Sequence, residues 1–143
     1  MKKYEFRLDT AIADIAFYAY GKSLEELIEN ACLALTDAMV DSEKVGTKTE
    51  KRIKVSGNSS EDLLYNAMEE VIYLKDAKQL VFSGFKVTAL ETDGLYHASV
   101  SLKGEKIDRQ KHQAHADVKA VTMKDFGIEK WKNGFRASVI LDI

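Results

Sequence analysis

Two segments of the chain place their apolar residues at helical spacing, whereas the apolar residues from Leu80 onward alternate with polar ones. The first segment follows Ser23, which can cap a helix together with Glu26 three residues later. The second follows Asn58-Ser59-Ser60-Glu61 and has an apolar stripe two residues wide, typical of a deeply packed helix. The stripes consist of Leu24, Leu27, Ile28, Ala31, Leu35, Ala38 and Met39, and of Leu63, Leu64, Ala67, Met68, Val71 and Ile72.

Most of the remaining chain has the pattern of β-strands. Residues 4–20 predict one bent strand or two short ones, ended by Gly21. Asp93-Gly94 separates two alternating runs, which predicts a hairpin. The strand-like runs are 4–20, 47–56, 82–90, 95–102, 115–123 and 136–143, with a turn around 131–134 before the last. We therefore predict an α+β fold in which two helices pack on a mostly antiparallel β-sheet.

Length and composition narrow the class of protein. The 143 residues include no proline, no linker and no repeat, so we predict a single domain spanning residues 1–143. A net charge of −2 argues against a general nucleic-acid-binding module. No run approaches the length of a membrane span, and the single cysteine, Cys32, is predicted to be a buried thiol. These features predict a cytoplasmic protein that does not enter a membrane.

Motifs of the common enzyme classes are missing. The sequence contains no Walker A loop, no Gly-x-Gly-x-x-Gly, no Cys-x-x-Cys and no Gly-x-Ser-x-Gly elbow. His112 and His115 are spaced as metal ligands can be, but we interpret them as solvated residues of a charged loop. The chain is therefore predicted not to be an enzyme.

Acidic groups stand at both strand-like ends of the chain. Asp14 lies within an apolar run, and Asp142 precedes the α-carboxylate of Ile143. We predict that the fold brings these two ends together. If a metal binds there, the all-oxygen ligands favour a hard cation such as calcium or magnesium over zinc. The alternative is an edge-strand aspartate that accepts backbone N–H bonds, and the residues alone leave both interpretations open.

A second cluster centres on Lys119. If residues 115–122 form a strand, His115, Asp117 and Lys119 share one face. Lys119, flanked by Val118 and Ala120, would then be placed to hold a phosphate or a partner's carboxylate. The alternative is a ladder of paired charges across neighbouring strands.

Short motifs along nearly the whole chain resemble the archease family. Each is weak alone, but their order and spacing together are specific. They are Ala13-Asp14-Ile15-Ala16, Tyr20-Gly21, Leu24-Glu25-Glu26, Leu63-Leu64, Glu69-Glu70, Tyr73-Leu74, Gly104-Glu105, Val118-Lys119-Ala120-Val121-Thr122 and Ile140-Leu141-Asp142-Ile143.

The resemblance implies a non-catalytic partner of the RtcB-type tRNA-splicing RNA ligase, which promotes the ligase's guanylylation and multiple turnover. It implies a divalent cation, calcium before magnesium or manganese, bound by Asp14, Asp142 and the Ile143 carboxylate. It assigns Lys119 a part in activation, and we add Glu69 and Glu70 to the partner-facing set. Contact with tRNA is expected only through the ligase.

The sequence departs from the family pattern at Ala11-Ile12, where many members have His-Thr, and at Met123-Lys124, where an aromatic-His pair is frequent. A second function remains open beside ligase activation. As an RNA-binding chaperone or modulator of tRNA-processing enzymes, the protein would bind RNA alone in a salt-sensitive way, for which the acidic composition gives poor support.

Overall fold

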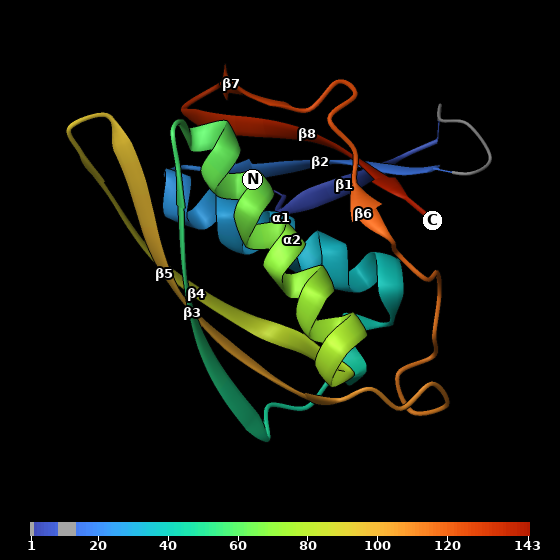
Figure 1. Ribbon diagram of the computed structural model, residues 1–143. Helices are drawn as coiled ribbons and strands as arrows, with labels where there is room; N and C mark the ends of the chain where they lie inside the picture. The colour runs from blue at the N-terminus through green and yellow to red at the C-terminus, as the bar shows by residue number, and fades with distance from the viewer. Residues whose placement is uncertain (1, 9–13) are drawn as a thin grey trace.

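The computed structural model describes residues 2–8 and 14–143, and these form two antiparallel sheets with two α-helices between them (Figure 1). Residues 9–13, which include Ala11-Ile12 and Ala13, lie outside the described residues. The first sheet contains β1 (Tyr4–Arg7), β2 (Asp14–Gly21), β6 (Ala120–Val121), β7 (Gly127–Trp131) and β8 (Gly134–Asp142). The second contains β3 (Thr49–Gly57), β4 (Leu80–Thr92) and β5 (Leu95–Lys106). The helices are α1 (Leu24–Met39) and α2 (Ser60–Lys78), with a short 3₁₀ turn at Ser42–Lys44.

The first sheet joins the two ends of the chain. Its strand order is β1-β2-β8-β6, with β7 also paired to β8. β2 pairs with β8 over the full length of β2, from Asp14 opposite Asp142 to Gly21 opposite Phe135. The predicted run 4–20 is therefore two strands, β1 and the longer β2, and the C-terminal run is a strand between β2 and β6.

The second sheet is the predicted hairpin with β3 added along β5. The turn lies at Asp93 and Gly94, both of which have positive φ, and glycine adopts that conformation without steric cost. β4 and β5 approach very closely at Gly104, where a Cβ atom would lie 1.9 Å from the Val81 carbonyl oxygen. Only glycine fits this position.

Helix α1 links the two sheets because it packs against both β2 and β4. Ser23 caps it as predicted, since the Ser23 hydroxyl accepts the Glu26 backbone N–H at 3.1 Å. Its two buried polar side chains bond strand carbonyls, Asn30 to Tyr20 at 2.6 Å and Thr36 to Phe82 at 2.7 Å. These bonds satisfy groups whose unpaired burial would be costly.

Helix α2 packs mainly on β3 and α1. The Ser59 hydroxyl caps it by accepting the Asp62 backbone N–H at 3.1 Å. Both predicted apolar stripes enter one continuous core, which also receives side chains from both sheets and the Cys32 thiol. Among the described residues, no helix has the length and apolarity that a membrane crossing requires.

The structure corrects three details of the sequence prediction. There are two sheets where one was expected. The run 115–123 forms a strand only at 120–121, because residues 115–119 bond to α1, to α2 and to the end of β8 and have no continuous strand partner. The turn expected around 131–134 is present at Lys132 and Asn133, but the sequence did not predict the strand before it, β7, which covers residues 127–131.

Candidate functional site

Asp14 and Asp142 face each other across the β2–β8 ladder. The carbonyls of Asp142 and Ile140 accept N–H bonds from Lys119 and Thr122 on the other side of β8. Asp14 and Asp142 therefore form a non-hydrogen-bonded pair, in which Cα atoms are about 4.5 Å apart and side chains share one face. Asp14 is half-buried, Asp142 is exposed and Ile143, also half-buried, follows directly. The structure thus brings the three predicted ligand residues to one end of the sheet.

Lys119 lies at the same end of the sheet. Its backbone N–H donates to the Asp142 carbonyl at 2.8 Å, and the next residue, Ala120, is opposite Asp142 in the β6–β8 ladder (Figure 1). The Lys119 side chain is exposed. Its main chain is therefore fixed beside the paired aspartates while the ammonium group remains accessible.

Two side chains of α2 hold the segment that carries Lys119. Glu69 Oε2 accepts the Val121 backbone N–H at 3.1 Å. Lys75 Nζ donates to the Val118 carbonyl at 2.7 Å and to the Asp117 carboxylate at 2.9 Å. Burial lowers the pKa of Lys75, but hydrogen bonds with Asp117 and Asp76 outweigh it and raise the pKa overall. The charged lysine thus holds the segment at Asp117 and Val118.

The predicted partner-facing acids thus have different surroundings. Glu69 is half-buried, and its hydrogen bond to the Val121 backbone of β6 helps to fix the position of Lys119. Glu70 is half-buried on α2 beside it. Asp117 is paired with Lys75, and the His115 ring contacts the Asp37 carbonyl at 2.7 Å. The prediction that His115, Asp117 and Lys119 share a strand face is therefore wrong.

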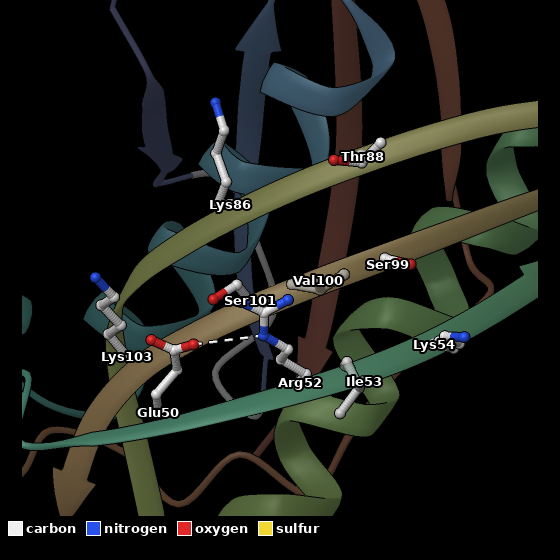
Figure 2. Close-up of a pocket in the computed structure, with 10 residues that line it drawn as sticks. All are labelled: Glu50, Arg52, Ile53, Lys54, Lys86, Thr88, Ser99, Val100, Ser101 and Lys103. Atoms are coloured by element: carbon white, nitrogen blue, oxygen red, sulfur yellow. Dashed lines mark hydrogen bonds and ion pairs between the residues drawn. The ribbon is translucent and has the colours of Figure 1, made fainter.

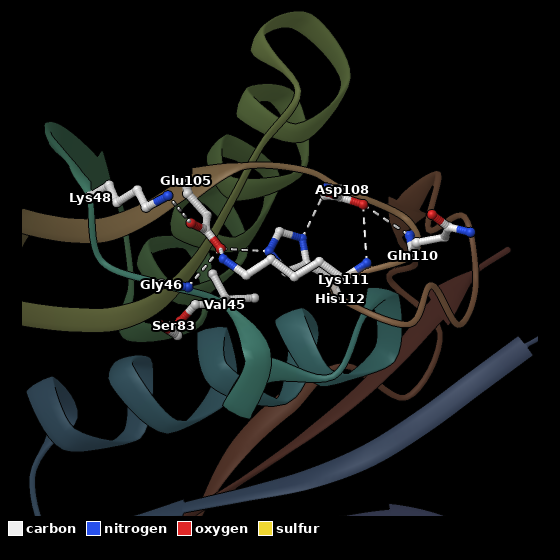
Figure 3. Close-up of polar contacts among 9 residues, drawn as sticks. All are labelled: Val45, Gly46, Lys48, Ser83, Glu105, Asp108, Gln110, Lys111 and His112. Carbon is white, nitrogen blue, oxygen red and sulfur yellow. Dashed lines mark hydrogen bonds and ion pairs between the residues drawn. The ribbon is translucent and has the colours of Figure 1, made fainter.

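A buried carboxylate anchors the loop that leads to Lys119 (Figure 3). Glu105 Oε2 accepts from Lys111 Nζ at 2.6 Å, from the Gly46 backbone N–H at 2.8 Å and from His112 Nε2 at 2.7 Å. Hydrogen bonds from Lys111, Gly46 and His112, in that order, lower the pKa of Glu105 from 4.5 to about 2. The carboxylate is therefore charged throughout the physiological range.

His112 completes this cluster. Its Nδ1 accepts the Asp108 backbone N–H at 3.0 Å, so Nδ1 carries no hydrogen and Nε2 donates its hydrogen to Glu105. His112 is fully buried, and the interpretation of it as a solvated loop residue is wrong. Its carbonyl accepts the Asp41 backbone N–H at 2.8 Å, which ties the loop to the end of α1.

Backbone hydrogen bonds hold the next part of this loop, between His112 and the first sheet. The N–H groups of His115 and Ala116 donate to the carbonyls of Met39 and Ala38, at 2.8 and 3.2 Å. The chain then reaches the Lys75 contact and β6. The loop between β5 and β6 is thus attached at Glu105, at the C-terminal end of α1 and at α2, and this sequence of contacts places Lys119.

The residues at the strand end fit a hard cation by their chemistry. Two aspartates directly opposite each other repel, and a divalent cation between them would remove the repulsion. The donors are all oxygens, which calcium and magnesium prefer. Among the described residues, no group of three or more His, Cys, Asp or Glu side chains is placed to hold a metal. A site here therefore needs a further ligand, and the Ile143 carboxylate is the predicted one.

Sequence reasoning missed Lys75, Glu105 and His112 as residues that position Lys119. Gly104-Glu105 belonged to a recognised motif, which was the available signal for Glu105. Lys75 stands in the polar last turn of α2, and nothing in its neighbours distinguishes it from Lys78. Only the folded chain shows that its side chain spans to Val118.

Comparison with known proteins gives consistent results along the whole chain. The model of the archease protein family matches residues 4–143. The archease of Pyrococcus furiosus is 40% identical, with 100% of both chains covered. The archease of Methanosarcina mazei is 37% identical, covering 99% of this chain and 97% of that protein.

Solved structures agree with this relationship. Protein 1598 of Methanobacterium thermoautotrophicum, known from a solution structure, is 36% identical, with a TM-score of 0.87 and 100% of both chains covered. The crystal structure of a Thermotoga maritima archease, described as a possible chaperone, has a TM-score of 0.62 at 21% identity. The match covers 96% of this chain and 98% of that one, and at this identity it supports the fold alone. The chain belongs to the archease family.

Proposed function

We propose that this protein activates an RtcB-type tRNA-splicing RNA ligase in the cytoplasm, promoting guanylylation and multiple turnover without catalysing a reaction itself. The observation that carries the proposal is the strand end at which Asp14, Asp142 and Lys119 meet. Acidic ligands and an accessible lysine at one exposed edge suit contact with a partner's phosphate-containing site. Membership of the archease family and the motifs quoted above support the same assignment.

The proposal includes a divalent cation, most suitably calcium, held by Asp14, Asp142 and the Ile143 carboxylate. When bound, such an ion supplies a fixed positive charge at the strand end. The chain's own residues supply the placement: the β2–β8 register sets the aspartates opposite each other, and β6 sets Lys119 beside them. Preorganised charge of this kind is most effective near phosphate groups, where negative charge gathers.

The direct test is RNA joining with the ligase limiting and GTP present, with and without this protein. We expect multiple turnover only when the protein is added, and faster labelling of the ligase with guanylate. Ligation that is equally fast in both reactions would overturn the proposal. The protein without ligase should join no RNA, and joining there would overturn its non-catalytic character.

Replacing Lys119 by alanine is expected to reduce ligase activation at least about tenfold while leaving the fold intact. The side chain is exposed, so the free energy of unfolding should change by no more than about 0.5 kcal/mol. Melting temperature and multiple-turnover ligation are measured on the same preparation. Lys130→Ala, which removes an exposed lysine from β7, is the matched control. Full activation by a folded Lys119→Ala protein would remove Lys119 from the mechanism.

A peptide tag added after Ile143 is expected to weaken calcium binding, because it converts the proposed carboxylate ligand into a neutral amide. The same tag at the N-terminus is the control and should have a smaller effect. Isothermal titration calorimetry with calcium compares the two tagged proteins with the untagged one. Equal affinities in all three would exclude the Ile143 carboxylate as a ligand.

A further inference from the structure

The second sheet turns one face towards the helices and leaves the other open. Buried residues such as Ala98, Val100 and Leu102 of β5 point to the core, while the alternate residues Ser99 and Lys103 are exposed. An open groove of about 630 Å³ lies along the three strands β3, β5 and β4. Figure 2 shows the side chains that line it. We refer to this surface as the outer face of the second sheet.

The outer face is basic although the chain as a whole is acidic. Its lining includes Arg52 and Lys54 of β3, Lys86 of β4 and Lys103 of β5, with Glu50 as its one acidic residue. All five of these side chains are exposed. The net charge of the whole chain is −2, so the basic residues on this face are a local concentration that composition conceals.

Strand register sets the spacing of these charges. Arg52 is opposite Ser101, which is opposite Lys86, so the Cα atoms of Arg52 and Lys86 stand about 10 Å apart across the sheet. Arg52 and Lys54 are two residues apart on one strand, or about 7 Å. Strand pairing thus fixes the positions from which these cationic side chains extend, and a string of regularly spaced anions can contact several of them at once.

Hydroxyl groups fill the positions between the cations. Ser99, Ser101 and Thr88 lie in the groove, and hydroxyls and cationic side chains are the usual donors to phosphate oxygens. None of the described residues that line the groove is aromatic, so there is no platform on which a base could stack. This chemistry suits a sugar-phosphate backbone and offers the bases no stacking contact.

We propose that the outer face of the second sheet binds the phosphate backbone of RNA without sequence preference. The choice of RNA over DNA rests on the proposed function. The charge complementarity itself does not, and the binding needs no ligase. With three to four phosphate contacts to a single strand, log K should fall with log salt concentration at a slope of about −2 to −3.

Fluorescence anisotropy with a labelled single-stranded RNA of mixed sequence tests the proposal. The double variant Lys54→Gln, Lys86→Gln is expected to bind about tenfold more weakly in low salt, with a slope shallower by about 1.4. The control double variant Lys51→Gln, Lys130→Gln removes the same charge from exposed sites elsewhere. Lys51 belongs to β3, so it controls for changes in that strand. Equal losses of RNA affinity in the two double variants would show that net charge alone causes the effect, and would overturn the proposal.

Removing the negative charge of Glu50 should change RNA affinity in the opposite direction, towards tighter binding. Its carboxylate lies 3.4 Å from Arg52 Nε and competes with a phosphate for that side chain. Glu50→Gln is therefore expected to strengthen RNA binding several-fold, whereas Glu91→Gln on the hairpin should do less. An acidic peptide that displaces RNA at equal charge concentration would assign the face to a protein segment instead. Retained ligase activation by the double variant, with loss of RNA binding, would separate this surface from the activation site.

Discussion

The Asp14→Asn and Asp142→Asn variants are expected to bind calcium at least about tenfold more weakly than the parent protein does. This is a loss of about 1.4 kcal/mol in the free energy of calcium binding. The two carboxylates share one face at directly opposite positions of β2 and β8. Loss of either removes a charged ligand from a proposed site that has only two side-chain carboxylates, and ligand charge governs calcium affinity. Isothermal titration calorimetry measures the effect, and ligase activation should fall with it.

Thermal melting separates the ion from the fold in the same variants. In the presence of a calcium chelator, Asp142→Asn should melt at or above the temperature of the parent, because the repulsion between the opposed aspartates is relieved. In calcium, the parent alone should gain stability, since an ion that binds only the folded state stabilises it by mass action. Asp93→Asn, at the exposed hairpin turn with φ of 53°, is the control. Parent-like calcium binding in both variants would exclude the site.

The elements that sequence predicted well are those whose signals are local. Ser23 and Ser59 cap their helices through bonds to residues three positions away, which the sequence displays directly. Asp93-Gly94 specifies its turn through the backbone conformations of two adjacent residues. Convergence of Asp14 with Asp142 was also predicted, from the acidic groups carried by strand-like apolar runs at both ends of the chain, and the β2–β8 ladder confirms it.

The elements that sequence did not predict depend on distant partners. Residues 115–119 alternate as a strand would, but their polar groups bond to the end of α1 and to Lys75 of α2, so most of the run never joins the sheet. His112 stands among charged residues and yet is buried, because Glu105 on β5 accepts its hydrogen. The apolar periodicity of a segment indicates which of its residues are buried. It does not indicate which distant residue will supply a hydrogen bond.

Replacing Glu105 by alanine is expected to lower the free energy of unfolding by about 2 to 4 kcal/mol, because each buried donor left without its acceptor costs about 1 to 3 kcal/mol. The change leaves His112 Nε2–H, which is fully buried, and the Gly46 N–H without their acceptor. The loop should then detach from the end of α1 and carry Lys119 away from Asp142. Chemical denaturation measures stability, and ligation measured well below the melting temperature should show weaker activation of the ligase. Glu91→Ala, at an exposed site of β4, is the matched control.

The parent and Glu105→Ala should differ in their free energy of unfolding, and the pH dependence of that difference shows whether the Glu105 charge causes it. The pKa of Glu105 is lowered in the folded protein to about 2 from 4.5, so the carboxylate contributes stability above about pH 4.5 and loses it as the pH falls towards 2. The stability gap between the parent and Glu105→Ala should therefore be full at pH 7 and narrow progressively below pH 4.5. The gap for Glu91→Ala should stay near zero throughout. A Glu105→Ala gap that is equally large at pH 7 and pH 2.5 would show that lost packing, and not the charged hydrogen bonds, holds this loop.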